Sequence, residues 1–248
     1  MQTVQISSNA FSGPMPSAFQ AITMPNLTSL DISGNLFSGP IADDYFNSMQ
    51  LTLLNMGSNR FNGGTPSSIG TMVGLKTLSL QNNNFAESLP VFIGNLSSLQ
   101  TLQLSGNLYN GSIPSSYCFL KQLVTLELAS NQLNGNLSDC FANLTSLTYL
   151  NIQTNLMSGS LPAALSKMIG LETLKLGQNL FAGNVSGLYF RNLTKLITLD
   201  MSLMNTQSGY LIGLNFAQLP ALRNLYAPFL LHNQIIALMN ILLDMSKA

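Results

Sequence analysis

The chain has 248 residues, with nine Lys or Arg, nine Asp or Glu and one His, so its formal net charge is zero and only 7% of its residues are charged. Nucleic acids and anionic membranes are bound through clustered basic residues, and this composition therefore argues against both as partners. Hydrophobic residues make up 46% of the chain, which is enough for a full core.

From the start of the chain, an asparagine recurs at a nearly constant interval. The interval is 26 residues once and then 24 residues six times. The recurring residues are Asn9, Asn35, Asn59, Asn83, Asn107, Asn131, Asn155 and Asn179. Each closes the pattern LxxLxLxxN, in which Leu, Ile, Val or Met fills the three apolar positions. Repetition at this period predicts a stack of near-identical coils.

The pattern within each repeat predicts how a coil is built. Alternating apolar and polar residues predict a short strand whose leucines point inward, and stacked coils place these strands about 4.8 Å apart in a parallel sheet. The asparagine after the strand is predicted to point inward and to bond the backbone of its own coil and the next. Two residues later, a large residue such as Phe61 or Tyr109 predicts a second buried stack. The fourth residue after the asparagine is Gly in all repeats but one, where it is Glu87, and predicts a positive-φ bend.

These features are clearest in Asn107-Leu-Tyr-Asn-Gly111-Ser-Ile-Pro114 and Asn155-Leu-Met-Ser-Gly159-Ser-Leu-Pro162. They resemble the plant-type leucine-rich repeat, whose unit reads LxxLxLxxNxLxGxIPxxLxxLxx, over roughly residues 1–204. The resemblance implies an α/β solenoid, a right-handed superhelix with a parallel β-sheet on the concave face and short helical, 3₁₀ or extended segments on the convex side. We expect about nine coils in residues 1–204, of which the first is incomplete and uncapped.

The first residues of the chain do not predict a secretion signal. Met1 already fills the first apolar position of a repeat and leads directly into polar Gln2 and Thr3, without a basic start or an apolar run. We interpret the chain as a truncated ectodomain or an incomplete gene prediction, with a natural protein capped by a partner as the alternative.

Two cysteines, Cys118 and Cys140, lie in neighbouring repeats, eleven and nine residues after the repeat asparagine. This spacing permits a disulfide without requiring one. Two small buried thiols are the preferred interpretation. No Cys/His cluster has the spacing of metal ligands, so no metal site is expected.

Seven N-x-S/T sequons for N-glycosylation occur along the chain. Their asparagines are Asn26, Asn95, Asn110, Asn136, Asn143, Asn184 and Asn192. Sequons matter only in a secretory protein, and the Asn-Leu-Ser/Thr sequons recur partly because the repeat recurs. Together with the resemblance, they predict an extracellular glycoprotein or a cell-surface ectodomain of a membrane protein.

The end of the chain departs from the repeat. A ninth copy places Met204, and a tenth places Leu230, where an asparagine is expected. Apolar residues spaced by three and four between Phe229 and Leu243 predict a helix. A membrane span needs about 20 apolar residues, so we prefer a capping helix to a membrane remnant. Residues 205–248 are thus predicted to form a degenerate last repeat and an apolar capping helix.

The sequence has no converging acid, base and nucleophile, so neither enzyme activity nor a cofactor is expected. Its one histidine, His232, lies in the degenerate tail. The adjacent acidic residues Asp43 and Asp44 are interpreted as a solvated turn or helix start. No phosphate-binding Gly-rich loop and no kinase signature are present.

The outward strand positions are nearly all uncharged hydrogen-bonding residues, which suits a peptide, carbohydrate or protein ligand more than an electrostatically steered partner. The centre of a concave face offers a ligand contact with the largest number of coils, so we assign binding to the middle coils. The assigned residues are Gln103, Glu127, Tyr149, Asn151 and Lys175. Tyr149 is taken as an aromatic anchor, with packing over neighbouring threonines as the alternative.

The resemblance implies a non-catalytic recognition module, as in the ectodomains of plant receptor-like proteins and receptor kinases, with a co-receptor ectodomain as a further partner. A related interpretation is a secreted inhibitor similar to the polygalacturonase inhibitors. A different one is ice binding, because some plant-type members are antifreezes and residues such as Thr77, Thr101 and Thr125 share one strand position. Leu53 and Tyr149 interrupt this threonine array, which counts against an ice surface as partner.

Overall fold

The computed structural model of the chain describes residues 2–20, 23–47, 49–182, 185–186, 190–204, 211–212 and 218–226. Three of the expectations above lie outside these residues: the helix between Phe229 and Leu243, the placement of His232, and the sequon at Asn184.

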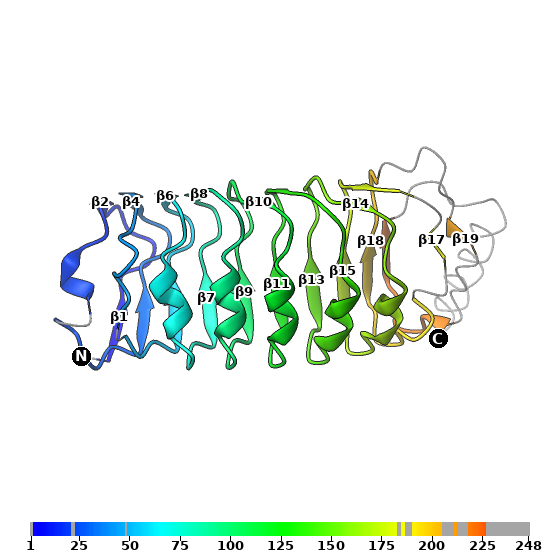
Figure 1. Ribbon diagram of the computed structural model, residues 1–248, viewed down its shortest axis with the longest axis horizontal. Helices are drawn as coiled ribbons and strands as arrows, with labels where there is room; N and C mark the ends of the chain where they lie inside the picture. Colours follow the sequence, from blue (N-terminus) through cyan, green and yellow to red (C-terminus); the bar gives the residue numbers. More distant parts are fainter. Residues whose placement is uncertain are drawn as a thin grey trace.

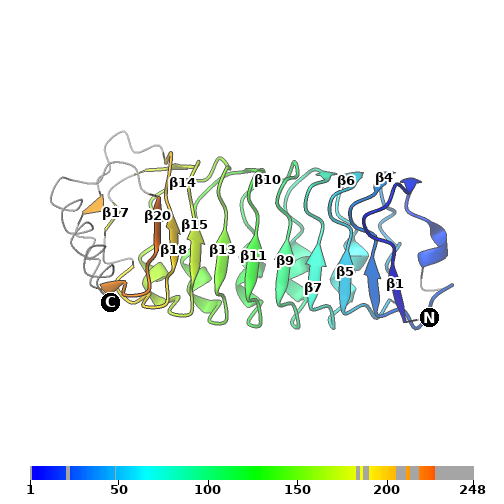
Figure 2. The same ribbon diagram turned by 180° about the vertical axis from the view of Figure 1, so that it is seen from behind.

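A parallel sheet runs the length of the described chain, with one strand from each coil (Figure 1). In spatial order its strands are β1 (Thr3–Gln5), β3 (Ser29–Asp31), β5 (Leu53–Asn55), β7 (Thr77–Ser79), β9 (Thr101–Gln103), β11 (Thr125–Glu127), β13 (Tyr149–Asn151), β15 (Thr173–Lys175), β18 (Thr198–Asp200) and β20 (Asn224–Tyr226). Each strand pairs with its neighbours in register, position for position. The regular repeat length keeps this register, and Figure 2 shows the strands from the other side.

Short strands on a second side of the coils form small parallel sheets after the repeat asparagines. Within the described residues these strands are β2 (Ser12–Gly13), β4 (Leu36–Gly39), β6 (Arg60–Gly63), β8 (Asn84–Phe85), β10 (Asn110–Gly111), β12 (Gln132–Leu133), β14 (Ser158–Gly159), β16 (Leu180–Phe181), β17 (Val185–Ser186) and β19 (Leu211–Ile212). They bring the chain from the main sheet to the outer side of the solenoid.

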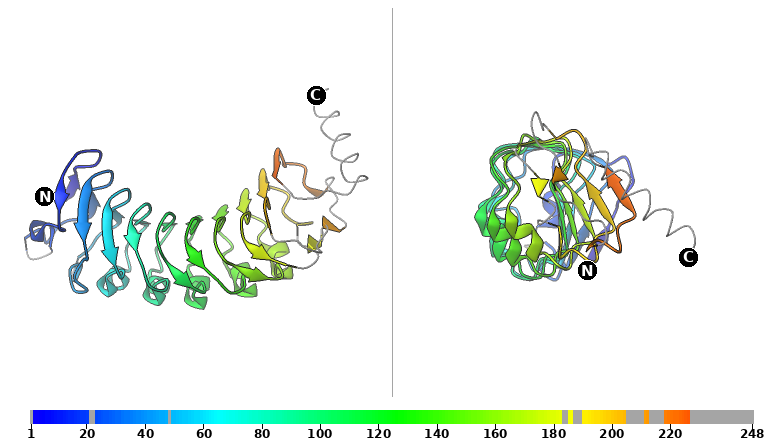
Figure 3. Two further views of the ribbon diagram at one scale, coloured as in Figure 1. Left: turned by 90° about the horizontal axis from the view of Figure 1, so that it is seen from above. Right: turned by 90° about the vertical axis from the view of Figure 1, so that its right-hand side faces the viewer.

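Single-turn 3₁₀ helices form the outer side. In the described chain they are η1 (Ser17–Phe19), η2 (Ser67–Thr71), η3 (Val91–Asn95), η4 (Ser115–Phe119), η5 (Asp139–Asn143) and η6 (Ala163–Lys167). The repeat proline precedes most of them in an extended conformation, and before η5 Ser138 takes its place and accepts a hydrogen bond from the Cys140 N–H at 3.3 Å. Figure 3 shows the coils bent into an arc, with the main sheet on the inner, concave side and these helices on the convex side.

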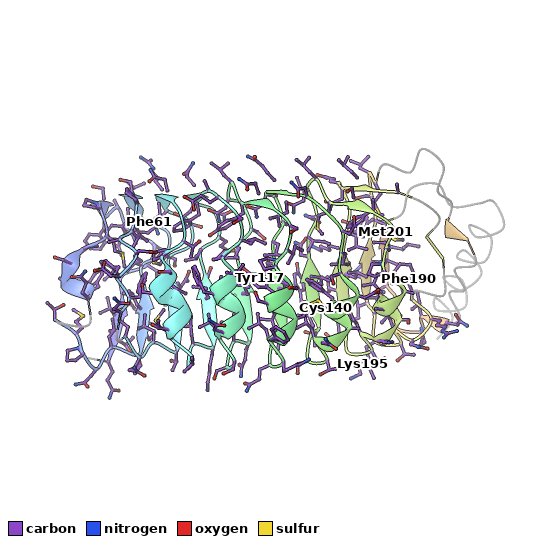
Figure 4. All side chains as sticks on the ribbon, viewed as in Figure 1. Phe61, Tyr117, Cys140, Phe190, Lys195 and Met201 are labelled. Carbon is purple, nitrogen blue, oxygen red and sulfur yellow. A yellow bond between two sulfur atoms is a disulfide. The ribbon has the colours of Figure 1, made fainter. Side chains whose placement is uncertain are left out.

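The leucines of the repeat fill the space between the sheet and the helices. Leu78, Leu102 and Leu126, at the centre of successive strands, have no exposed surface. Large side chains from the other sides of the coils, including those of Phe61 and Tyr117, complete the same core (Figure 4). The alternation seen in the sequence is therefore the alternation between this core and the concave surface.

The repeat asparagines form the predicted ladder. From Asn35 to Asn179 they are buried, apart from half-buried Asn131, and each Nδ2 donates to carbonyls of its own coil and of the preceding coil. Each Oδ1 accepts the backbone N–H of the large residue in the preceding coil, as Asn83 does from Phe61 at 3.0 Å. The bonds thus run to the preceding coil and not to the next. Asn9, in the first described coil, is exposed, and its side chain bonds only carbonyls of its own coil.

Aromatic rings stack beside the ladder as the sequence predicts. The centroids of Phe37, Phe61, Phe85 and Tyr109 follow one another at 6.2, 6.3 and 6.4 Å with nearly parallel planes. Leu133, Met157 and Phe181 continue this row as buried side chains. Each ring covers the next, which removes apolar surface from water along the whole stack.

The chain bends through positive-φ residues both before and after the repeat asparagines. The predicted positive φ occurs at the repeat glycines, with values of 72° to 95°, and also at Glu87 with 74°. A second positive-φ residue, which the sequence analysis missed, directly precedes every ladder asparagine, with values of 53° to 68°. These residues are Ser8, Gly34, Ser58, Asn82, Gly106, Ser130, Thr154 and Gln178. Two glycines and one asparagine at this position were the available signal.

A disulfide joins Cys118 of η4 to Cys140 of η5, on the convex side of adjacent coils. The preferred interpretation of two free thiols was therefore wrong. The two cysteines lie at different positions of their repeats, but both 3₁₀ helices face the same way, and the Cα atoms are 5.7 Å apart. This separation is ordinary for a disulfide.

Candidate ligand-binding surface

The concave face is formed by the first and third residues of the main strands, which point away from the core. The first-position row is Thr3, Ser29, Leu53, Thr77, Thr101, Thr125, Tyr149, Thr173, Thr198 and Asn224. The third-position row is Gln5, Asp31, Asn55, Ser79, Gln103, Glu127, Asn151, Lys175, Asp200 and Tyr226. Most of these side chains are half-buried, so part of their surface is accessible from the concave side.

Gln103 and Glu127 form a side-chain pair at the middle of the third-position row. They are directly paired residues of β9 and β11, and Gln103 Nε2 donates to Glu127 Oε1 at 2.9 Å. The bond fixes one carboxylate oxygen and orients the amide. The remaining carboxylate and amide atoms of this half-buried pair can still bond a ligand.

Tyr149 and Lys175 form a second pair, two coils further along. Lys175 reaches diagonally from β15 across the face, and its Nζ lies 6.0 Å from the centroid of the Tyr149 ring. This distance is the outer limit of a cation–π contact. Tyr149 stands between Thr125 and Thr173 in the first-position row, so its larger ring rises above its neighbours. Lys175 therefore places a cation beside the one aromatic ring of the middle coils on this face.

Asn151 does not belong to the accessible set, contrary to the sequence-based assignment. Only 6% of its surface is exposed, and its Oδ1 accepts the backbone N–H of Gln153 at 3.2 Å. The same turn recurs where Asp31 accepts from Ser33 and where Asn55 accepts from Gly57. Asp or Asn in the third position therefore satisfies its own strand end and offers little to a partner.

Ser79 is also buried, although its position on the strand is outward. Its exposed fraction is 2%, and its Oγ has no hydrogen-bond partner within the described residues. The side chain of Gln81 lies across the adjacent coil, above Gly57, where a Cβ would meet Gln81 Cγ at 3.1 Å.

The threonines of the first-position row are in register, as Thr77, Thr101 and Thr125 show. Leu53 and Tyr149 interrupt the row, and the sheet that carries it is curved (Figure 3). A curved row departs from a plane as it lengthens, so only neighbouring threonines could match a flat lattice.

The sequon asparagines within the described residues are all exposed, and none lies in either row of the concave face. They are Asn26, Asn95, Asn110, Asn136, Asn143 and Asn192. Sugars attached to them would leave the concave face accessible.

A cavity of about 210 Å³ on the convex side is lined by Asp43, Asp44, Asn47, Ser67, Ser68 and Thr71. Asp43 Oδ1 accepts the backbone N–H of Ser67 at 2.6 Å, and buried Ser68 Oγ accepts that of Phe46 at 3.1 Å. Asp43 and Asp44 are exposed and lie in a turn, as the sequence predicts, and Asp43 in addition joins this turn to the next coil. Across the described ranges, no three or more His, Cys, Asp or Glu side chains gather as a metal ion requires. In the same part of the chain, no helix has the length and apolar character of a membrane span.

A known protein family matches most of the chain. Residues 46–242 match the family described as leucine-rich repeat region, and residues 26–47 match a single leucine-rich repeat. No curated protein sequence matches the chain significantly.

Solved structures show the same architecture. The chain is 31% identical to a TDR receptor, with a TM-score of 0.79, covering 91% of this chain and 38% of that one. It is 25% identical to the Arabidopsis receptor kinase HAESA, solved with the peptide hormone IDA and the co-receptor SERK1, with a TM-score of 0.70, covering 91% of this chain and 41% of that one. The chain thus spans about two fifths of these receptor structures. A plant ice-binding protein is 23% identical, with a TM-score of 0.60 over 84% of this chain and 73% of that one, which shows the fold alone.

Proposed function

Because this chain belongs to the leucine-rich repeat family, we propose that it is a non-catalytic recognition module that binds a peptide or a protein partner on its concave face. The observation that carries this proposal is the pair of in-register rows along that face, in which most side chains are polar and half-buried. The sheet satisfies its own backbone groups, so a ligand is read by side chains.

The spacing of the coils suits an extended peptide that runs along the solenoid. Successive strands are about 4.8 Å apart, and an extended peptide advances about 3.3 Å per residue, so roughly two coils meet three residues. Hydrogen-bonding residues in every coil can then pair with the backbone groups of such a peptide. The face carries few charges, which favours this mode over electrostatic steering.

The middle coils supply the contacts with the most varied chemistry. Tyr149 provides an aromatic surface, Lys175 a cation beside it, and the Gln103–Glu127 pair an oriented amide and carboxylate. Aromatic residues near the centre of an interface dominate many binding energies. The site that we propose therefore comprises these four residues and excludes Asn151.

We place this module outside the cell, as the ectodomain or part of the ectodomain of a receptor-like protein. The similar solved structures include a TDR receptor and the Arabidopsis receptor kinase HAESA, the latter with a peptide hormone and a co-receptor bound. The exposed sequons away from the concave face agree with this location. A co-receptor ectodomain is the corresponding protein partner.

A displayed library of random peptides tests the proposal. Peptides selected on the wild-type chain should lose at least tenfold in affinity for Tyr149→Ala and for Glu127→Ala, because both side chains lie at the centre of the face. Val91→Ser is the matched control, since Val91 is 66% exposed on the convex helix η3. Selected peptides that bind both concave variants as well as the wild type, or that respond to Val91→Ser instead, would place recognition elsewhere.

A further inference from the structure

Phe119 is an apolar residue that the fold leaves uncovered. It ends η4 on the convex side, and 69% of its surface is exposed. This makes it the most exposed aromatic residue in the part of the chain that the structure describes. The aromatic residues of the repeat interior, in contrast, are covered by their neighbours. An exposed benzyl group of this size leaves apolar surface in water unless something covers it.

The positions on either side of Phe119 are both sequon asparagines. Asn95 ends η3 and Asn143 ends η5, so each occupies in its own coil the place that Phe119 occupies in η4. Both asparagines are exposed, as are the hydroxyl residues of their sequons, Ser97 and Thr145. The repeat therefore places the two acceptor asparagines at the position equivalent to Phe119 in the coils on either side of it.

The two amides are also free to react. Within the described residues, neither the Asn95 nor the Asn143 side chain makes a hydrogen bond, whereas the ladder asparagines use both amide atoms. The ammonium group of the neighbouring Lys121 donates to the backbone carbonyl of Asn143, at 3.2 Å, and not to its side-chain amide. Asn136 differs, because its side-chain amide packs against the backbone of Gly159 in the next coil.

We infer that Asn95 and Asn143 carry N-linked glycans and that the first N-acetylglucosamine of at least one of them covers the ring of Phe119. The apolar face of a pyranose presents polarised C–H groups, which the negative face of an aromatic ring attracts. Its hydroxyl groups on the other side stay in water. The inference rests on the extracellular location proposed above and is independent of the ligand on the concave face.

Attachment uses the standard chemistry of a lipid-linked oligosaccharide donor. A bond forms between the asparagine Nδ2 and C1 of the first sugar, while the bond from C1 to the pyrophosphate oxygen of the donor breaks. The amide loses one proton, and the lipid pyrophosphate takes it up as the leaving group.

The test uses the full chain secreted from a eukaryotic host, with its glycans trimmed to single N-acetylglucosamine residues. Glycopeptide mass spectrometry should find sugar on Asn95 and on Asn143. In NMR spectra, ring currents should shift protons of at least one of these sugars upfield, and Phe119→Ser should abolish the shift while Phe119→Tyr retains it. Asn95→Gln combined with Asn143→Gln should increase the fluorescence of an apolar dye at least twofold, and adding Phe119→Ser should reverse the increase.

Val91→Ser provides the control, because Val91 is similarly exposed but its counterparts in the neighbouring coils are Ser67 and Ser115. It should leave the sugar signals unchanged. Empty sequons at both positions would overturn the inference, and so would occupied sequons whose sugar protons do not respond to Phe119→Ser. Loss of self-association in Phe119→Ser, independent of the glycans, would also overturn it, since a second copy would then be the cover. Absence of any peptide ligand would leave all of these results unaffected.

Discussion

Asn107 Oδ1 accepts the backbone N–H of Phe85, in the preceding coil, at 3.0 Å. Its Nδ2 donates to Leu80 O of that coil at 2.9 Å and to Leu104 O of its own coil at 3.1 Å. One side chain thus satisfies backbone groups of two coils in the interior.

Asn107→Ala should lower the free energy of unfolding by about 3 kcal/mol, because each buried backbone group left without a partner costs about 1–3 kcal/mol. Urea unfolding followed by circular dichroism measures the change. Asn9→Ala is the control and should cost less than about 1 kcal/mol, since Asn9 is exposed and bonds only its own coil. Equal effects of the two substitutions would mean that the ladder does not join coils.

Glu87→Gly should stabilise the chain by up to about 1 kcal/mol, because a non-glycine residue at positive φ stores strain that glycine releases. Glu87 is exposed at φ 74° and takes the place of the repeat glycine. The reciprocal Gly111→Glu, at φ 72°, should destabilise by about 1 kcal/mol. A Cβ at Gly111 meets nothing closer than 3.7 Å, so the effect there is conformational and not steric. In thermal unfolding, the midpoint temperature should be higher than that of the wild type for Glu87→Gly and lower for Gly111→Glu.

Alkaline pH should destabilise the chain through its interior tyrosines. Burial raises the pKa of Tyr109 and, together with the proximity of Tyr109, that of Tyr117. In the unfolded chain a tyrosine titrates near pH ~10, so the stability that the neutral phenols contribute is complete below that pH and is lost as pH rises above it. Each such tyrosine lowers stability by about 1.4 kcal/mol per pH unit in that range.

Tyr117→Phe should flatten this alkaline dependence, measured as the urea midpoint against pH, because it removes one titrating phenol and keeps the ring. The hydroxyl of Tyr117 makes only a 3.4 Å hydrogen bond to Pro90 O, so its loss should cost little at neutral pH. An unchanged slope would show that other groups set the alkaline limit.

Reduction of the Cys118–Cys140 disulfide should lower stability by about 3 kcal/mol, the loop-closure estimate for a sequence separation of 22 residues. Urea unfolding with and without dithiothreitol measures the difference. In the double variant Cys118→Ala with Cys140→Ala, dithiothreitol should have no further effect. A chain whose unfolding midpoint is indifferent to the reductant would refute the assignment of this bond as a stabilising one.

The purified protein should not inhibit the recrystallisation of ice. The threonine row is interrupted at Leu53 and Tyr149, and its sheet is curved, so the row cannot match a flat lattice over many coils (Figure 3). Inhibition at micromolar concentration that disappears in Thr101→Lys would instead favour ice as the partner of this face.

The sequence predicted the parts of the fold that repeat. The periodic leucines place the strands, and the inward asparagines follow from the need to pair buried backbone groups, as Asn59 and Asn155 illustrate. The direction of the ladder bonds was not predictable, because an amide can serve either neighbouring coil equally well. The Cys118–Cys140 bond was also missed, since a linear repeat register does not show which way two side chains leave single-turn helices.

The candidate binding surface was predictable in position but not in detail. An outward strand position was taken as accessible, yet Asn151 accepts the backbone N–H of Gln153 and is buried, and Ser79 is buried as well. An outward residue reaches a partner only if its side chain extends past its neighbours. The alternation of inward and outward residues in the sequence does not show this. Tyr149 and Lys175 satisfy this requirement, and their contact is a diagonal one that a residue-by-residue list of coils does not reveal.

The orientation of the asparagine ladder also sets the order in which the coils can be completed. Each carboxamide bonds the backbone of the coil that precedes it, so a coil is complete only once its successor has been added. On a ribosome, where the amino-terminal part of a chain emerges first, the growing solenoid should therefore mature one repeat behind the segment that is leaving the exit tunnel.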